Sequence, residues 1–162
     1  RWGQIRPSNG ARPGWRNQRI SGRALVRAGY RLWLDRWPEE RGIRLPLGQI
    51  AEVTAVQYYP LAGEPVELGG QVYQVVTGDR GGVFLYPGEN WPAAVLRPAR
   101  GISVDFTAGW AARGDVPKVL RQAALLLVSK LYDGFDAGDE GARIDQAVRA
   151  LVVNLYPVGG LS

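Results

Sequence analysis

The chain has 162 residues, a formal net charge of +5 and no Cys, His or Met. Without Cys and His, disulfides, thiolate chemistry and the usual zinc sites are excluded, and the commonest general base is missing. We therefore expect a protein that is not an enzyme and that binds no cofactor and no metal. No apolar run approaches the roughly 18 residues of a membrane span, and the first residues lack a signal-peptide pattern, so we expect a soluble, unsecreted protein without a membrane partner. Because position 1 is not Met, we also expect residues upstream of it.

Residues 1–20 form a basic stretch that Pro and Gly interrupt, without helical or alternating apolar spacing. This composition predicts an extended or disordered arm. The first 44 residues contain eleven Arg against three acidic residues, whereas the remainder of the chain is mildly acidic. Such asymmetry predicts an anionic partner for the arm, either nucleic acid or the acidic face of another subunit, with a solvated tail as the alternative. The candidate contacts are Arg6, Arg12, Arg16 and Arg19.

Residues 30–106 carry the signals of about seven short strands separated by turns. Gly and Pro pairs at hairpin spacing predict an antiparallel meander or a small sandwich. Trp37 and Trp91, together with nearby Tyr residues, suit either an aromatic sugar-binding platform or ordinary packing at strand ends, and packing is the commoner role. The expected strands are Tyr30–Pro38, Ile43–Leu45, Ile50–Tyr59, Val66–Leu68, Val72–Val76, Val83–Tyr86 and Ile102–Phe106.

The strongest helix signal covers residues 116–133. Asp115 suits the N-cap, Pro117 suits the first turn, and apolar residues then recur at helical spacing. The breadth of the apolar surface predicts a buried core helix, with the further possibility that its remaining exposed face packs on copies of itself. The expected packing residues are Val119, Leu120, Ala123, Leu127 and Leu131.

A second amphipathic helix is expected over residues 142–156, after an acidic linker at residues 136–141. Asp139 and Glu140 are placed near its positive N-terminal end. Pro157 ends the helix, and residues 157–162 form a short tail. Strands followed by two helices predict an α+β protein of one domain.

Seven pieces of the sequence carry a resemblance to a known family. They are SGRAL (21–25), YRLWLDRWP (30–38), IRLPLGQIAEVTAVQYY (43–59), VFLYPGENWP (83–92), ISVDFTAGW (102–110), VPKVLRQAALLLVSKLYD (116–133) and AVRALVVNLYPV (147–158). With these pieces in this order, the chain resembles the head-tail connector, or adaptor, proteins of long-tailed phages and of gene transfer agents, the gp6-like connectors. The resemblance covers about residues 21–158, which would form the connector domain.

This resemblance implies a small helical bundle with an antiparallel β-rich insertion at residues 30–106 and extended N- and C-terminal arms. It implies a structural subunit of a ring of about twelve copies, which joins the portal protein to the stopper or tail-completion protein and forms part of the DNA channel. Double-stranded DNA would pass it without sequence-specific contacts. The location would be the head-tail interface of the virion, with assembly in the cytoplasm of the bacterial host.

The resemblance also implies roles for particular residues. The C-terminal arm would bind the portal, the helix at 116–133 would make core and ring contacts, and the basic arm would line the channel or pair with acidic residues. The first 19 residues depart from the family, whose members have helices ahead of the SGRAL piece. The alternative function is a sequence-neutral nucleic-acid-binding module that uses the basic arm, and a carboxylate-based glycosidase is weaker because no second acid is well placed. The portal-binding residues would be Leu151, Leu155, Tyr156, Pro157 and Val158.

Overall fold

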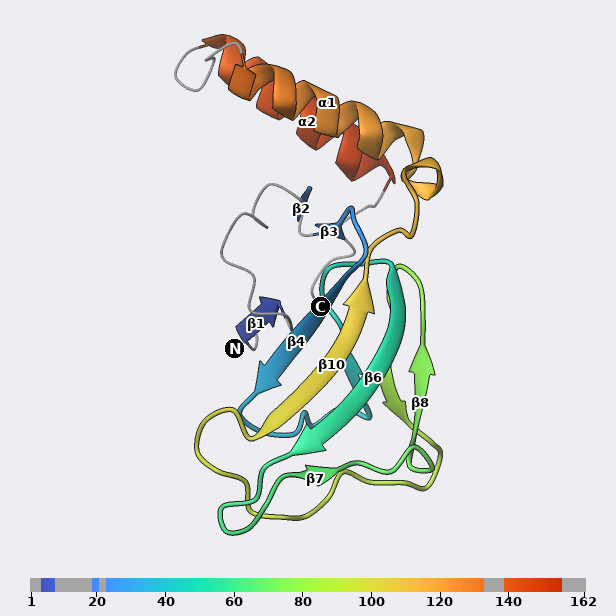
Figure 1. The fold of residues 1–162 in the computed structure, drawn as a ribbon, viewed down its shortest axis with the longest axis vertical. Helices are drawn as coiled ribbons and strands as arrows, with labels where there is room; N and C mark the ends of the chain where they lie inside the picture. The colour runs from blue at the N-terminus through green and yellow to red at the C-terminus, as the bar shows by residue number, and fades with distance from the viewer. Residues whose placement is uncertain (1–3, 8–18, 21–22, 133–138, 156–162) are drawn as a thin grey trace. The chain divides into compact units, whose positions relative to one another are not determined.

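The computed structural model describes residues 4–7, 19–20, 23–132 and 139–155 (Figure 1). The chain divides into two compact units, Arg1–Ala111 and Ala112–Ser162. The first unit, called the β unit below, contains the strands, and the second, the helical unit, contains two helices that follow the strands in sequence. The predicted α+β class is therefore confirmed. In the described ranges no helix is both long enough and apolar enough to cross a membrane.

A five-stranded antiparallel sheet forms the larger part of the β unit, in the order β1-β4-β10-β6-β7 (Figure 1). Strand β10 lies at its centre, and Val104 pairs with Leu32 on one side and Val56 on the other. Two register shifts along the β10–β6 pair bend the sheet locally. The bounds are β1 Gln4–Pro7, β4 Ala28–Leu34, β6 Ile50–Tyr58, β7 Val66–Glu67 and β10 Ile102–Ala108.

Two smaller antiparallel sheets complete the β unit. In the three-stranded sheet, Gly82 pairs with Arg44, and a Cβ at this position would collide with the carbonyl oxygen of Ile43. This glycine was predicted to belong to a hairpin turn, but it lies inside a strand where the neighbouring backbone leaves no room for a side chain. The three-stranded sheet has the order β5 (Gly42–Arg44), β9 (Gly82–Leu85) and β8 (Tyr73–Val76), and the two-stranded one pairs β2 (Arg19–Ile20) with β3 (Arg23–Ala24).

One face of the five-stranded sheet supplies most of the core of the β unit. Alternate residues of β10 are buried, and Phe106 packs against Tyr30 of β4 with ring centroids 5.8 Å apart. Ile43 and Val83 of the three-stranded sheet join the same buried cluster. All seven predicted strands overlap observed strands, β4 to β10, and the alternation of the predicted strand Tyr30–Pro38 matches the alternate burial of Tyr30 and Leu32 in β4.

The helical unit begins with a short 3₁₀ turn, Arg113–Asp115, followed by α1 (Lys118–Tyr132) and α2 (Asp139–Leu155). The prediction that Asp115 caps the first helix is wrong, because its carboxylate accepts the N–H of Ala112 at 3.1 Å and closes the 3₁₀ turn instead. The carbonyl of Pro117 accepts the N–H of Arg121 at 3.1 Å, so this residue does open α1. The two helices lie side by side (Figure 1), and α2 starts inside the segment predicted to be a linker.

Candidate interaction surfaces

The predicted packing helix separates into a buried and an exposed side. Leu120 and Ala123 of α1 are fully buried, whereas Val119 and Leu127 are half-buried. Leu131 lies in α1, but its side chain is outside the described set. Nζ of Lys130 and Oδ2 of Asp145 lie 2.9 Å apart, which links α1 to α2.

The exposed side of α1 carries three large apolar residues that the sequence did not single out as a group. The side chains of Leu125, Val128 and Tyr132 are 61%, 60% and 90% exposed. Their spacing of three and four residues places them in one row on the helix surface. Arg121 extends this row by one turn, and its Nε is buried without a hydrogen-bond partner in the described part of the chain. We call these four residues the α1 stripe.

The predicted portal-binding residues lie at the end of α2 and beyond it. Leu151 is half-buried in α2, and Leu155 is the last residue of this helix. The Leu155 side chain is outside the described set, and so are Tyr156, Pro157 and Val158. The structure thus places the first two on one helix, one turn apart.

The predicted anion-binding arginines are distributed over separate elements. Arg6 lies in β1, at the edge of the five-stranded sheet and in register with Arg31 of β4. Arg19 lies in β2, opposite Ala24. Arg12 and Arg16, like the side chains of Arg6 and Arg19, are outside the described part.

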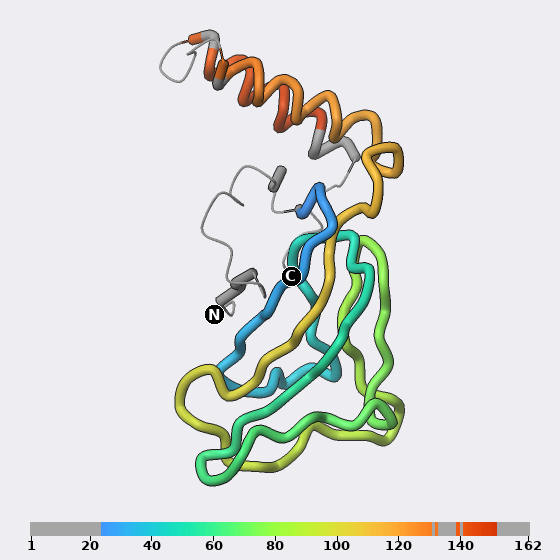
Figure 2. Tube along the Cα trace, viewed as in Figure 1, coloured from blue at the N-terminus to red at the C-terminus, as the bar shows by residue number. Residues whose placement is uncertain are grey.

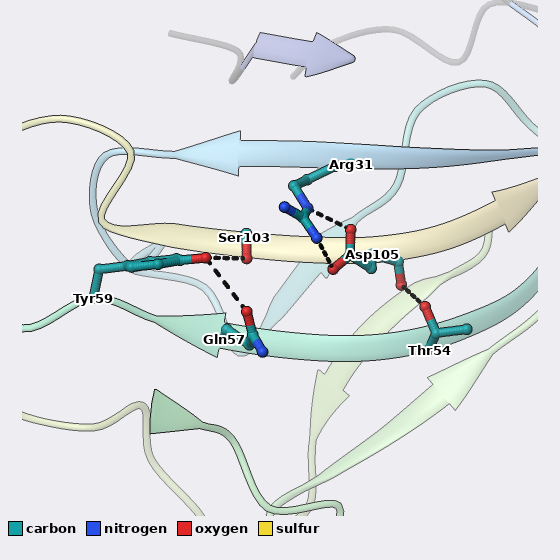
Figure 3. A network of polar contacts seen from close by, with 6 residues as sticks. All are labelled: Arg31, Thr54, Gln57, Tyr59, Ser103 and Asp105. Carbon is teal, nitrogen blue, oxygen red and sulfur yellow. Dashed lines mark hydrogen bonds and ion pairs between the residues drawn. The ribbon is translucent and has the colours of Figure 1, made fainter. Parts of the chain in front are cut away.

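The outer face of the five-stranded sheet carries an ion pair that joins β4 to β10 (Figure 3). Arg31 donates from Nε to Oδ1 of Asp105 at 2.6 Å and from Nη2 to Oδ2 at 2.8 Å. This hydrogen bonding raises the pKa of the Arg31 guanidinium above its ordinary value, against the opposing effect of burial. The Oγ1 of Thr54 donates to the main-chain carbonyl of Asp105 at 3.1 Å, so a side chain of β6 also bonds to this residue of β10.

A second polar group lies beside this ion pair on the same face (Figure 3). The Tyr59 hydroxyl donates to Gln57 at 3.3 Å and shares a hydrogen bond with the fully buried Ser103 at 3.4 Å. The Arg97 guanidinium lies 4.0 Å from the Tyr59 ring centroid and 5.6 Å from that of Trp33. These polar groups contact one another, so we interpret this face as internally stabilised and not as a binding surface.

The tryptophans that were weighed as a sugar platform pack together instead. Trp37 and Trp91 stack with centroids 4.7 Å apart and an interplanar angle of 8°. Trp37 also contacts Tyr58 at 6.0 Å, and the Trp91 indole donates to the carbonyl of Glu40 at 3.0 Å. Both tryptophans lie against the core cluster, which favours the packing interpretation. Within the described residues, no group of three or more Asp and Glu side chains is placed to hold a metal ion.

One corner of the β unit is both apolar and acidic. Leu61, Val66 and Val95 are 64%, 40% and 72% exposed, and Glu64 and Glu67 are exposed beside them in sequence. We call these five residues the acidic corner. The loop after β6 and the loop before β10 run side by side here (Figure 2).

Backbone hydrogen bonds fix the two loops of the acidic corner to each other. The N–H of Leu61 donates to the carbonyl of Val95 at 2.8 Å, and the N–H of Arg97 donates to that of Tyr59 at 3.0 Å. Burial, and then the charge of Glu67, raise the pKa of the nearby Tyr73 hydroxyl. The sequence signal for this corner was weak, because isolated apolar residues in Pro- and Gly-rich loops show no periodicity. Loops nevertheless run over protein surfaces, so such residues are candidates for contacts.

Comparison with known proteins gives matches among solved structures. No family model matches the sequence, and no curated protein is significantly similar to it. A chain from the neck of an empty gene transfer agent (GTA) particle, computed with C6 symmetry, is 26% identical with a TM-score of 0.69, over 88% of this chain and 72% of that one. A chain from the neck of the native particle, computed with C12 symmetry, is 26% identical with a TM-score of 0.68, over 88% and 76%.

A third match, from the virion of the native GTA particle, is 28% identical with a TM-score of 0.67, over 88% of this chain and 72% of that one. These similarities support a structural protein of the neck type. They also support a virion location, because the matched chains are components of neck and virion structures. The resemblance predicted from the sequence is confirmed at this level.

Proposed function

We propose that this protein is a head-tail connector of the gp6-like type, a ring subunit that joins the portal to the stopper or tail-completion protein. The observation that carries this proposal is the similarity to neck chains over 88% of the chain. The C6 and C12 symmetries of those necks support a ring, and C12 supports twelve subunits. The ring would assemble in the cytoplasm of the bacterial host and surround passing double-stranded DNA.

The exposed surfaces suit a protein that contacts several neighbours. A ring subunit needs two different lateral surfaces, because a cyclic contact joins unlike patches of identical chains. It also needs axial contacts to the components above and below. The α1 stripe and the acidic corner each contain three exposed large apolar residues, and they belong to different units. We assign the α1 stripe to contacts with a second copy in the ring.

The end of α2 and the residues after it form the proposed portal contact. A terminal arm adds contact area to an assembly without enlarging the domain, and a ring multiplies each contact by avidity. The apolar residues of this arm are those named from the sequence: Leu151, Leu155, Tyr156, Pro157 and Val158.

Binding to a portal ring tests the proposal directly. We expect the intact chain to elute with the portal in size-exclusion chromatography, and light scattering would give the number of copies bound. Changing Leu155 and Tyr156 to Ser should weaken this attachment about tenfold or more through lost apolar burial, with an unchanged circular dichroism spectrum. The matched control changes two exposed residues of α2, Gln146 and Arg149, to Ser. If the intact chain does not bind the portal, the connector function is wrong. If the intact chain binds and the Leu155 and Tyr156 variant binds equally well, the assignment of the C-terminal arm to the portal contact is wrong.

A further inference from the structure

The α1 stripe continues toward the start of its helix into a basic end. Lys118 lies three residues before Arg121, so it precedes the stripe in the same row on the helix surface. Lys118 is exposed, and neither of these cations forms an ion pair with a described residue. The row thus has two cations at one end, three exposed apolar side chains at the other and no acidic residue: Lys118, Arg121, Leu125, Val128 and Tyr132.

The α1 stripe needs an unlike surface as its partner in a ring. Two identical stripes in contact would relate the copies by a twofold axis, and such a contact ends at a dimer. A larger ring is closed by contacts between unlike surfaces of identical chains, and the similar neck chains come from necks computed with C6 and C12 symmetry. A partner surface for the basic and apolar row should be apolar and acidic.

The acidic corner combines these two properties. Outside the α1 stripe and the corner, every exposed large apolar residue of the described ranges lies in an uncharged segment or beside a cation. The corner is therefore the better partner for a row that carries two cations. The other exposed apolar residues are Val75 and Val76 in the uncharged run 71–78, Val26 beside Arg27, and Tyr86, whose carbonyl accepts the Arg41 guanidinium at 2.6 Å.

The side chains of the acidic corner are free for such a contact. Glu64 and Glu67 are exposed, and neither forms an ion pair with a described residue. Val66 and Glu67 form β7, the edge strand of the five-stranded sheet, and no described strand pairs with its outer side. The N–H of Leu61 donates to the carbonyl of Val95 at 2.8 Å, which holds the apolar part in place. A patch that is already ordered loses little conformational entropy on binding.

We propose that the α1 stripe of one copy docks on the acidic corner of the next copy in the ring, with Lys118 facing Glu64 and Glu67. This inference rests on the proposed ring function, and it names the surface that receives the α1 stripe. The apolar side chains supply the buried area, and the charges fix the orientation and disfavour other partners. Exposed ion pairs are individually weak, but a ring repeats the contact in every copy.

Disulfide cross-linking between two populations of the chain tests this contact, because the chain has no Cys of its own. One population carries Gln122→Cys, an exposed position one turn from both Lys118 and Leu125, and the other carries Ala62→Cys beside Leu61. Each chain then has a single thiol, so any disulfide joins different copies. An affinity tag on one population distinguishes the mixed dimer by size on a non-reducing gel. The mixed dimer should be the main product of oxidation.

Matched controls separate this contact from random collision. Gln146→Cys on α2 replaces Gln122→Cys, and Gln74→Cys on β8 replaces Ala62→Cys; these positions are also exposed. Each control pairing should give at least about tenfold less mixed dimer. If the Gln122 variant forms more dimer with itself than with the Ala62 variant, the stripe pairs with itself and the proposal is overturned.

Charge reversal tests the chemistry of the same contact. Lys118→Glu in the first population should reduce the mixed dimer about fivefold at low salt, and Glu64→Lys with Glu67→Lys in the second population should restore it. The helix dipole favours Glu in the first turn of a helix, so the Lys118 variant should stay folded. The effect should fade at high salt, which screens exposed charges. An unchanged yield with Lys118→Glu at low salt would contradict the proposed facing of these charges.

The connector function and the stripe-to-corner contact can fail separately. Each series is run on the free mixture and on the mixture bound to a portal ring. A mixed dimer no stronger than the controls in both states, with portal binding intact, overturns the contact and leaves the connector function standing. Failure of the unmodified chain to bind a portal ring overturns the connector function itself.

Discussion

Arg31 and Asp105 lie directly opposite each other on β4 and β10 and share two hydrogen bonds. A bidentate guanidinium–carboxylate pair fixes both distance and orientation, so it favours this register over a shift by one residue. The Arg31 side chain is 39% exposed and that of Asp105 is 17% exposed. Solvent therefore screens the pair in part, and its contribution to stability is moderate.

Replacing Asp105 by Asn should lower the free energy of unfolding by about 1–2 kcal/mol, because one charged acceptor is lost. The measurement is urea unfolding followed by Trp fluorescence, and a double-mutant cycle with Arg31→Met isolates the coupling between the two side chains. The control is Thr54→Ala, which removes one exposed hydrogen bond to the main chain of the same residue and should cost less. A cycle with no coupling would show that the pair does not stabilise the sheet.

The same pair gives a clear expectation for pH. The pKa of Arg31 is raised in the folded state. The stability that Arg31 contributes is therefore fully present below the ordinary pKa of an arginine, and it is lost only as the pH rises through the raised pKa. That window lies far above neutrality. The unfolding free energy that depends on Arg31 should therefore stay constant across the neutral range.

Single residues were predicted with uneven success, and the failures have a physical cause. Asp115 is a good capping residue, but its carboxylate accepts the N–H of Ala112 at 3.1 Å, across the 3₁₀ turn. Sequence identifies the acceptor and leaves open which of several nearby donors it meets. Pro117 was predicted correctly because its fixed φ and missing N–H restrict where a helix can begin.

The strands that were predicted are runs of strand-forming residues bounded by turn residues. The three that were missed, β1 to β3, have two to four residues each and lie among Arg, Pro and Gly. Their strand conformation comes from pairing with another segment, which short sequence patterns do not encode. The interaction surfaces were less predictable for the same reason: the acidic corner exists because two loops 30 or so residues apart meet through backbone hydrogen bonds.

At the level of a helix, α1 permits a test of its exposed side against its buried side. Changing Leu125 and Val128 to Ser should cost less than about 1 kcal/mol of unfolding free energy, because both side chains are largely exposed. The same change should reduce ring assembly, which the α1 stripe is proposed to mediate. Light scattering of the free and portal-bound chain measures assembly, and thermal unfolding measures stability.

Leu120 supplies the opposite control for α1. It is fully buried, so Leu120→Ala should cost about 2–5 kcal/mol of unfolding free energy. Stability should thus fall in the Leu120 variant and assembly should fall in the stripe variant. If the variant with Leu125 and Val128 changed to Ser assembles normally, the α1 stripe is not part of the ring contact.

Over the whole molecule, positive charge is concentrated at the start of the chain. Residues after position 44 are mildly acidic, so the basic arm and the body of the protein attract each other between copies as well as within one. The arm contains Arg12, Arg16 and Arg19 as well as Arg6. Around a ring, these side chains would repeat in every copy and present a positive lining to passing phosphates.

Replacing Arg12, Arg16 and Arg19 by Ser should therefore reduce DNA retention in assembled particles and leave ring assembly unchanged. The physical reason is counterion release: contacts to phosphates are independent of sequence, and their strength falls steeply with salt. Retention is measured as DNA per particle after sedimentation at increasing salt, and the deficit should grow with salt concentration. A matched variant removes the same charge from exposed arginines elsewhere in the described chain, namely Arg80, Arg113 and Arg143. Equal loss in both variants would attribute retention to total charge, and no loss in either would leave the arm with subunit contacts alone.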